Sequence, residues 1–430
     1  MKRPALQRDP QSSPWIKAGV PARQILPATV PDPVAAPRSS PPVKPGPGQR
    51  DIKTFTRDEL VATFEGWDER AFRVDQLLDW IYTRRVTGWD AMTNIPKPLR
   101  DRLAAEFASG SLALARKQGS RDTTQKLLWR LRDGALIESV LIPANPALYG
   151  EASDRHTLCV STQVGCAYGC GFCASGLEGW KRNLTPDEIV EQVLATERVA
   201  AAESRVSDSP AGVPKPGTRI PKLAARLINN LVIMGMGEPL ANYDNLLRAL
   251  AILNAPWGGG IGARKITIST SGLAPQIRRL ADEPLQFRLA ISLHGATDEV
   301  RSKLMPVNRR FPIRELAAAC EYHFQKKGKM ITFEYILIEG VNDHVSQARP
   351  LAQLAQRLHA KINLIPYNSV EGLQWKRPGE AAQEAFLAAL ERWHVPVTLR
   401  REKGHDIEAA CGQLRLRTER ELAPATRLPS

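Results

Sequence analysis

The chain has 430 residues, of which 43% are hydrophobic, so it is long enough to form one large core and a second, smaller domain. Its formal net charge of +14 favours a polyanionic partner such as nucleic acid, although a generally basic surface would explain the same excess. The start of the chain lacks a signal-peptide pattern and no apolar run approaches ~18 residues, so we expect a cytoplasmic protein with no membrane partner.

Two segments of different composition begin the chain. Residues 1–50 are rich in proline, serine and alanine and show neither a helical nor a strand period, which predicts a disordered extension. Residues 51–115 predict a small helical accessory domain. Its first helix begins after Thr56, because Glu59 three residues later completes a capping pattern, and apolar residues then recur at helical spacing.

Strand patterns dominate from residue 120 onward. Residues 120–145 contain two alternating runs around Asp133 and Gly134, which predict a β-hairpin that links the two domains. Residues 146–420 alternate strand-like and helix-like runs, so we predict an α/β fold with a partial (β/α)6 barrel and a flexible insertion at 200–222. The predicted strands begin at Thr157, Leu227, Lys265, Phe287, Ile331, Ile362 and Val395, and the predicted helices include 186–200, 243–253, 313–326, 346–360 and 380–393.

Three cysteines follow the first predicted barrel strand at steps of four and three residues: Cys166, Cys170 and Cys173. The ends of barrel strands are where functional residues lie, and the glycines between these cysteines allow the backbone to wrap tightly. Three thiolates suit an iron-sulfur cubane that keeps one iron open. A structural zinc site would need a fourth ligand, such as His156. From these residues alone three alternatives remain: an iron-sulfur cluster, a zinc site, or free cysteines whose spacing has no functional meaning.

Several motifs resemble one family. The C-x3-C-x2-C spacing, with Phe172 before the last cysteine, is the signature of radical S-adenosylmethionine (SAM) enzymes. Over residues 55–420 the order of motifs is similar to that of the RlmN family, the adenine carbon-2 methyltransferases of ribosomal and transfer RNA. The motifs are "TLCVSTQVGCAYGCGFCASGLEGWKRNLT", "GMGEPLANYDN", "ITISTSG", "SLHG", "LIPYN" and "DIEAACGQL".

This resemblance implies the fold, cofactors and partners. The barrel would be a radical-SAM barrel that holds one [4Fe-4S] cluster on the three cysteines and uses two SAM molecules per turnover. The substrates would be 23S rRNA and tRNA. An electron-donor protein such as flavodoxin or ferredoxin would reduce the cluster, and the enzyme would be a monomer.

The resemblance also assigns three catalytic residues. Carbon 2 of adenine is electron-poor, so it cannot attack a sulfonium methyl directly. In the family, one SAM methylates a cysteine that matches Cys411, and a 5′-deoxyadenosyl radical from a second SAM converts that methyl into a carbon radical that adds to the base. Glu138 matches the proton acceptor and would be desolvated if it faces inward, and Cys159 matches the thiol that releases the product through a disulfide. Without the resemblance, Glu138 would more often face solvent, and such cysteines, like Cys320, would more often be core residues.

Cofactor and RNA contacts carry over in the same way. Gly237 would allow close backbone approach, and Glu238 could accept the SAM ammonium group. The matched SAM contacts are Gly237, Glu238, Ser269, Ser292, Leu293, His294 and Asn368. Phosphate contacts would come from the helical accessory domain, at Arg70, Arg73, Arg84, Arg85, Lys97, Arg100 and Arg102.

Two other functions stay open. A related Cfr-type enzyme methylates carbon 8 of adenine with much the same cysteines. A non-catalytic RNA-binding protein could use the three cysteines only for an iron-sulfur or zinc site. The extension at 1–50, the link at 144–153 and the insertion at 200–222 depart from the family pattern.

Overall fold

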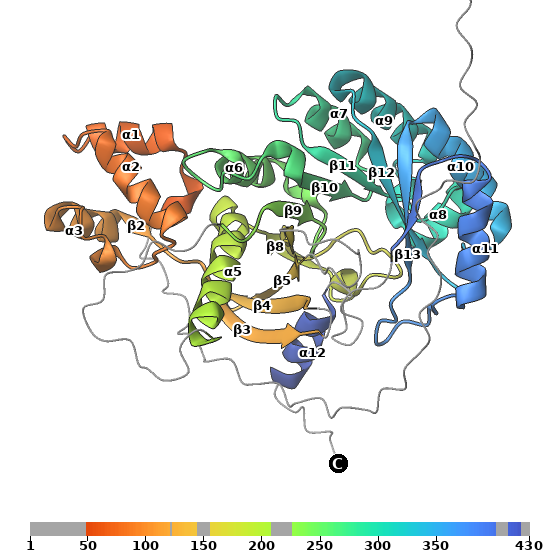
Figure 1. The fold of residues 1–430 in the computed structure, drawn as a ribbon, viewed down its shortest axis with the longest axis horizontal. Helices are drawn as coiled ribbons and strands as arrows, with labels where there is room; N and C mark the ends of the chain where they lie inside the picture. Colours follow the sequence, from red (N-terminus) through yellow and green to blue (C-terminus); the bar gives the residue numbers. More distant parts are fainter. Residues whose placement is uncertain (1–48, 121–122, 144–154, 208–225, 401–411, 423–430) are drawn as a thin grey trace, which may run out of the picture. The chain divides into compact units, whose positions relative to one another are not determined.

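The computed structural model describes residues 49–120, 123–143, 155–207, 226–400 and 412–422, all within one unit of the chain, Ala36–Ser430 (Figure 1). The predicted extension up to residue 48 and the link at 144–153 lie outside the described residues. Among the described helices, none combines the length and the apolar composition needed to cross a bilayer.

The first described segment is helical, as predicted. The capping pattern is confirmed, because the Thr56 backbone N–H donates to the Glu59 carboxylate (2.7 Å) and the Glu59 N–H donates to the Thr56 hydroxyl (3.3 Å). The segment is closed by a parallel pair of short strands, β1 and β2. Its elements are β1 (Arg50–Asp51), α1 (Arg57–Glu65), α2 (Phe72–Leu78), a π-helical turn η2 (Asp79–Thr83), α3 (Lys97–Glu106) and β2 (Phe107–Ala108).

One ten-stranded sheet forms the centre of the structure, with the order β14-β13-β12-β11-β10-β9-β6-β5-β4-β3. Strands β6, β9, β10, β11, β12, β13 and β14 pair in parallel with one another, which confirms the predicted α/β partial barrel. The strands are β3 (Leu112–Gly119), β4 (Gln125–Leu131), β5 (Leu136–Pro143), β6 (His156–Cys159), β9 (Asn230–Ile233), β10 (Ile266–Thr270), β11 (Arg288–Ser292), β12 (Ile331–Leu337), β13 (Ala360–Pro366) and β14 (Val397–Leu399).

The predicted hairpin is the pair β4 and β5, which turns at Gly134 with a positive φ of 86°. The structure adds a third strand, β3, which the prediction assigned in part to the helical domain. These antiparallel strands are not a separate linker, because β5 pairs with β6 and extends the barrel sheet. A short second hairpin, β7 (Gln163–Gly165) and β8 (Trp180–Asn183), flanks the three cysteines.

Helices cover the parallel strands: α5 (Pro186–Ser207), α6 (Tyr243–Asn254), α7 (Ala274–Asp282), α8 (Asp298–Leu304), α9 (Ile313–Lys327), α10 (Ala348–Arg357) and α11 (Glu380–Glu391). A last helix, α12 (Gln413–Leu422), packs against β5, and α5 packs against β3 (Figure 1). The prediction of a flexible insertion from residue 200 is wrong at its start, because α5 continues to Ser207 through helix-favouring alanine and glutamate residues. Residues 208–225 lie outside the described part.

Buried ion pairs join the helical segment to α5. The Lys53 ammonium contacts the carboxylates of Asp51 (2.7 Å) and Glu191 (3.4 Å), and all three side chains are at most 2% exposed. Arg85 pairs with Glu197 in the same way. Arg85 was predicted to contact RNA phosphates, and its burial beside Glu197 corrects that prediction.

Candidate active site

A cavity of about 350 Å³ lies at the carboxyl ends of the parallel strands. This volume is in the range of sites that hold small ligands. Its walls come from successive strand ends, because the chain leaves each parallel strand at the same edge of the sheet. The polar or thiol residues that line it include Cys159, Glu238, Ser269, Thr270, Ser271, Ser292, His294, Glu334, Tyr367, Asn368 and Arg400.

The three clustered cysteines all line this cavity. They belong to the cysteine loop, residues 166–173, which follows β7. The loop turns back on itself at Gly165 and Gly169, whose φ angles of 76° and 59° favour glycine. The structure therefore brings Cys166, Cys170 and Cys173 to one wall of one cavity, as the spacing predicted.

The surroundings of these thiols suit a bound metal group. Burial raises the pKa of Cys166 to about 12 and raises that of Cys170 well above its ordinary value. A metal group would supply the positive charge that thiolates need, so binding would release protons. In the described part of the chain, no three His, Cys, Asp or Glu side chains are placed so that together they could ligate one metal ion. His156, the fourth ligand considered for zinc, begins β6, whereas the cysteines follow the other end of that strand.

Six of the seven predicted SAM contacts line the cavity, and Leu293 lies in the core behind them. The Asn368 side-chain oxygen in this region has no hydrogen-bond partner among the described residues. Buried polar groups are normally satisfied, so this atom fits a site that accepts a polar ligand. The prediction named Ser269 and Asn368 in the motifs "ITISTSG" and "LIPYN" but not Ser271 and Tyr367 of the same motifs, and it did not name Glu334.

Glu238 organises two loops of the cavity. Its carboxylate accepts hydrogen bonds from the backbone N–H groups of Leu240 (3.0 Å) and Ser271 (2.7 Å), and burial raises its pKa. Gly237 has a φ of 98°, and a Cβ atom there would lie 2.5 Å from Gln163 Cβ. Glycine is therefore required by the packing of the protein itself, in addition to any approach of a cofactor.

Glu138 is buried and is bound to the start of the last helix. Its carboxylate accepts hydrogen bonds from the backbone N–H groups of Gly412 (2.9 Å) and Arg415 (2.6 Å), and the Lys126 ammonium lies 3.7 Å away. It is 3% exposed, so the expectation that it faces inward is confirmed. Glu138 shares a face of β5 with Val140, which lines the cavity opposite Cys159. Cys411 lies outside the described residues, but Gly412, the residue that follows it, donates its backbone N–H to the Glu138 carboxylate.

Comparison with known proteins decides the family. The family model "Ribosomal RNA large subunit methyltransferase N-terminal domain" matches residues 50–108, and that of the radical SAM superfamily matches residues 210–348. The "Probable dual-specificity RNA methyltransferase RlmN 3" of Opitutus terrae is 54% identical over 375 residues, which cover 87% of this chain and 96% of that protein. The "Dual-specificity RNA methyltransferase RlmN" of Anaeromyxobacter dehalogenans is 43% identical over 364 residues, covering 85% and 91%. The chain belongs to the RlmN family.

A solved structure agrees with this assignment. The radical SAM methyltransferase from Sphaerobacter thermophilus matches this RlmN-family chain with a TM-score of 0.74 and 41% sequence identity. The match covers 85% of this chain and 98% of that one. The fold and the family are therefore those of a radical SAM methyltransferase, which implies SAM and a [4Fe-4S] cluster as cofactors.

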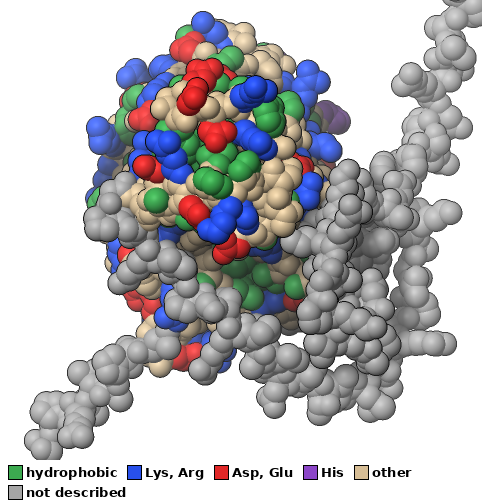
Figure 2. Space-filling view, turned by 90° about the vertical axis from the view of Figure 1, so that its left-hand side faces the viewer, with side chains coloured by type: hydrophobic (Ala, Val, Ile, Leu, Met, Phe, Trp, Pro, Cys, Tyr) green, Lys and Arg blue, Asp and Glu red, His purple; other side chains and the backbone are tan. Residues whose placement is uncertain are grey.

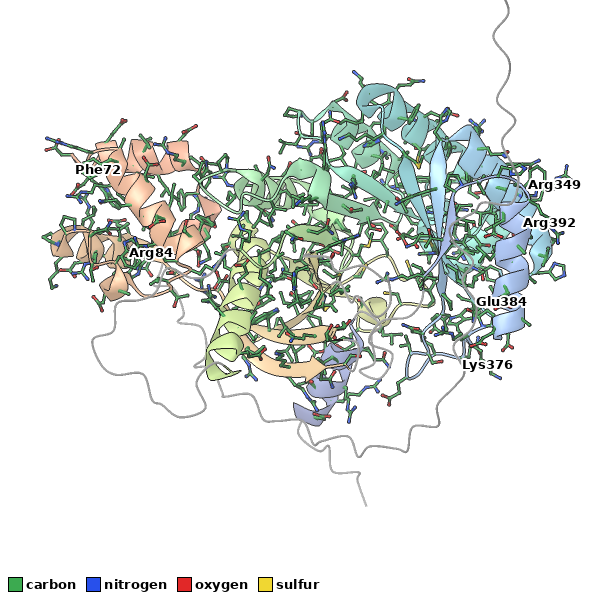
Figure 3. All side chains as sticks on the ribbon, viewed as in Figure 1. Phe72, Arg84, Arg349, Lys376, Glu384 and Arg392 are labelled. Carbon is green, nitrogen blue, oxygen red and sulfur yellow. The ribbon has the colours of Figure 1, made fainter. Side chains whose placement is uncertain are left out.

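The exposed cations of the helical segment are largely paired within the RlmN-family protein. Arg84 bonds Asp79 (2.7 Å) and lies over the Trp80 ring, and Lys97 pairs with Asp101 (2.7 Å). Figure 3 shows Arg84 on the helical segment, and on the face seen in Figure 2 basic and acidic side chains are intermingled. RNA contacts by these cations stay a prediction.

His294 makes the stability of the cavity depend on pH. Burial, and then the charge of Arg301, lower its pKa to about 3, and its Nδ1 accepts a hydrogen bond from the Ile336 N–H (3.1 Å), which requires an unprotonated nitrogen. The unfolded chain binds this proton near pH 6.5, so the stabilisation is complete above pH 6.5 and is lost as pH falls toward 3. Between about pH 7.5 and about pH 5 we expect wild type to lose free energy of unfolding, on the order of a few kcal/mol, in urea titrations.

The matched control is His294→Asn, because asparagine tolerates the positive φ of 55° at this position. It should lose less stability over the same pH interval. The buried His323, whose pKa is lowered to about 4, is present in both proteins and cancels from the difference. Equal losses in both proteins would show that His294 is not the responsible group.

Proposed function

We propose that this RlmN-family RNA methyltransferase methylates carbon 2 of adenine in 23S rRNA and in tRNA, as a cytoplasmic monomer. One observation carries the proposal: a single cavity is lined by Cys159 and the three clustered cysteines, while Glu138 beside it holds the residue that follows Cys411. Relatives named "dual-specificity" RNA methyltransferase support two classes of RNA substrate, and the family model named for large-subunit ribosomal RNA supports rRNA as one.

The cofactors have defined places in this proposal. Cys166, Cys170 and Cys173 would hold one [4Fe-4S] cluster, and the unpartnered side-chain oxygen of Asn368 would face SAM. When bound, one SAM molecule would supply a methyl cation equivalent. A second SAM molecule would supply a hydrogen-abstracting radical after it receives one electron from the cluster. An electron carrier such as flavodoxin or ferredoxin would provide that electron.

The residues of the chain carry the remaining steps. The Cys411 sulfur accepts the methyl group and, after loss of one hydrogen atom, its carbon bonds to carbon 2 of the base. Glu138 would then accept the proton that leaves carbon 2, and the unpaired electron of the adduct would pass back to the group held by the three cysteines. The Cys159 thiolate would attack the Cys411 sulfur, so that a disulfide forms, the carbon-sulfur bond breaks, and the released carbon keeps the electron pair and takes up a proton to become the methyl group. That disulfide must be reduced before the next turnover.

The test is nucleoside mass spectrometry of RNA treated anaerobically with cluster-loaded protein, SAM and a reductant. We expect 2-methyladenosine in both rRNA and tRNA substrates, identified against authentic standards. 8-Methyladenosine would instead assign the Cfr-type reaction. A cluster spectrum that does not change when SAM is added, together with no methylated adenosine, would favour the non-catalytic RNA-binding protein.

A further inference from the structure

The backbone of the cysteine loop forms part of the protein surface. Ala167 and Gly169 are exposed, whereas the cysteine side chains beside them line the cavity. Tyr168, between this exposed pair, lines both the cavity and a second hollow of about 470 Å³ that it forms with Tyr243, Arg279 and their neighbours. A group held by the three cysteines is therefore separated from the outside by little more than the loop itself.

Three exposed cationic side chains lie beside this loop. The loop packs against the end of α8, because the Gly171 N–H donates to the Leu304 carbonyl (2.9 Å). Lys303 adjoins that contact, and Arg309 and Arg310 follow in the next turn of the chain, at the end of the 3-10 helix η7 (Pro306–Arg309). Within the described ranges none of these three cations has an ion-pair partner.

The nearby acids do not cancel this charge. Asp298 and Glu299, both exposed on the first turn of α8, carry two negative charges against the three exposed cations. Asp244 in the hollow is paired with Arg279 (2.6 Å), so this face keeps a positive excess. The surface beside the cysteine loop therefore has a positive excess where Ala167 and Gly169 are exposed.

We propose that this basic face, formed by Lys303, Arg309 and Arg310 beside the cysteine loop, is the docking surface for a small acidic one-electron carrier protein. The inference rests on the proposed function, which needs an electron from outside. The carrier loses one electron, the group held by the three cysteines gains it, and no covalent bond forms. Opposite charge steers such encounters and sets their orientation.

RNA is another polyanion that a basic face attracts, but the structure favours the electron carrier here. A target adenine must enter the cavity, and on this side the backbone from Ala167 to Gly169 closes it. An electron can cross a thin layer of loop, whereas a base cannot. This face lies close to the cysteines, but it has no opening through which a base could enter the cavity.

The experiment compares cluster-loaded wild type with Arg309→Glu/Arg310→Glu. Reduced bacterial flavodoxin is the probe, and dithionite is a small reductant that needs no docking surface. The matched control is Arg288→Glu/Arg392→Glu: both arginines are exposed and lack an ion-pair partner within the described ranges. Arg288 begins β11 and Arg392 precedes β14, so they lie at the strand ends opposite the cysteine loop, and Figure 3 shows Arg392 at the end of α11. Calorimetry gives the Kd for flavodoxin, and stopped-flow absorbance gives the rate of cluster reduction.

We expect the Arg309/Arg310 variant to bind flavodoxin at least ~10-fold more weakly and to be reduced by it correspondingly more slowly. Reduction by dithionite and the control variant should match wild type. Unchanged flavodoxin affinity would overturn the proposal, as would weakened RNA binding with normal flavodoxin binding. Neither the Kd for flavodoxin nor the rate of cluster reduction depends on RNA methylation. A failure to find methylated adenosine would therefore count against the proposed function, whereas these two measurements alone decide the docking surface.

Discussion

Replacing Cys170 by alanine is expected to remove the cluster and to lower RNA methylation by more than about a hundredfold, since outer-shell partners of metal sites alone contribute 10–100-fold. The reason is local: Cys170 is the middle of three thiols on one cavity wall. The remaining two cysteines cannot supply the third ligand that a cubane with one open iron requires. Iron and sulfide content, visible absorbance and SAM cleavage after reconstitution measure the loss.

Cys320→Ala is the matched control for this experiment. Cys320 is also buried, and burial likewise raises its pKa to about 12, but it lies on α9 and is not part of the cavity wall. This variant should keep the cluster and the methylation activity. Normal iron content in Cys170→Ala, or loss of iron in Cys320→Ala, would contradict the assignment of the three clustered thiols.

Glu138→Gln is expected to slow product formation by about 10²–10⁴-fold, the usual contribution of a general base. The amide cannot take the proton from carbon 2, so a covalent RNA-protein species joined through Cys411 should accumulate. Gel electrophoresis with labelled RNA, followed by peptide mass spectrometry, detects it. Cys159→Ala should also accumulate an RNA-protein species joined through Cys411, in this case after carbon 2 has lost its proton, because it blocks the release step that follows.

Glu138 also has a structural role, which its control must separate. Its two backbone hydrogen bonds and its neighbour Lys126 mean that Glu138→Gln weakens the start of α12. Glu197→Gln disturbs another buried, cation-paired glutamate on α5, away from the cavity. It should lose stability without forming the RNA-protein species. A variant of Glu138 that loses activity, stays folded and forms no such species would show a positioning residue and not a base.

Local patterns predicted most of the elements correctly. The capping pair Thr56 and Glu59, the turn at Gly134 and the parallel strands each depend on residues close together in sequence, and the structure contains all of them. The strand β3 was missed in part because Leu112–Gly119 has only weak alternation and gains its pairing from β4. The end of α5 was placed too early, since the change in composition was taken as the boundary of the helix.

The candidate site was less readable where it depends on contacts across the fold. The cysteine spacing pointed to one wall of the cavity because all three thiols lie in one short loop. Glu334 lies in none of the recognised motifs, and only the shared strand edge brings it to the same cavity. The link from Glu138 to Gly412 spans 274 residues, so no local reading of either segment could show that a carboxylate anchors the last helix.

The buried pairs Lys53–Glu191 and Arg85–Glu197 limit how this protein can be divided or recombined. A shortened chain without the helical segment would lose Lys53 beside Glu191, which would keep only Arg198, and would lose Arg85, the partner of Glu197, so this face of α5 would be left exposed and acidic. The helical segment alone would expose Lys53 and Arg85 in place of its interior. A chimera that exchanges this segment between family members must therefore transplant α5 with it, and truncation is a poor way to ask what the segment does.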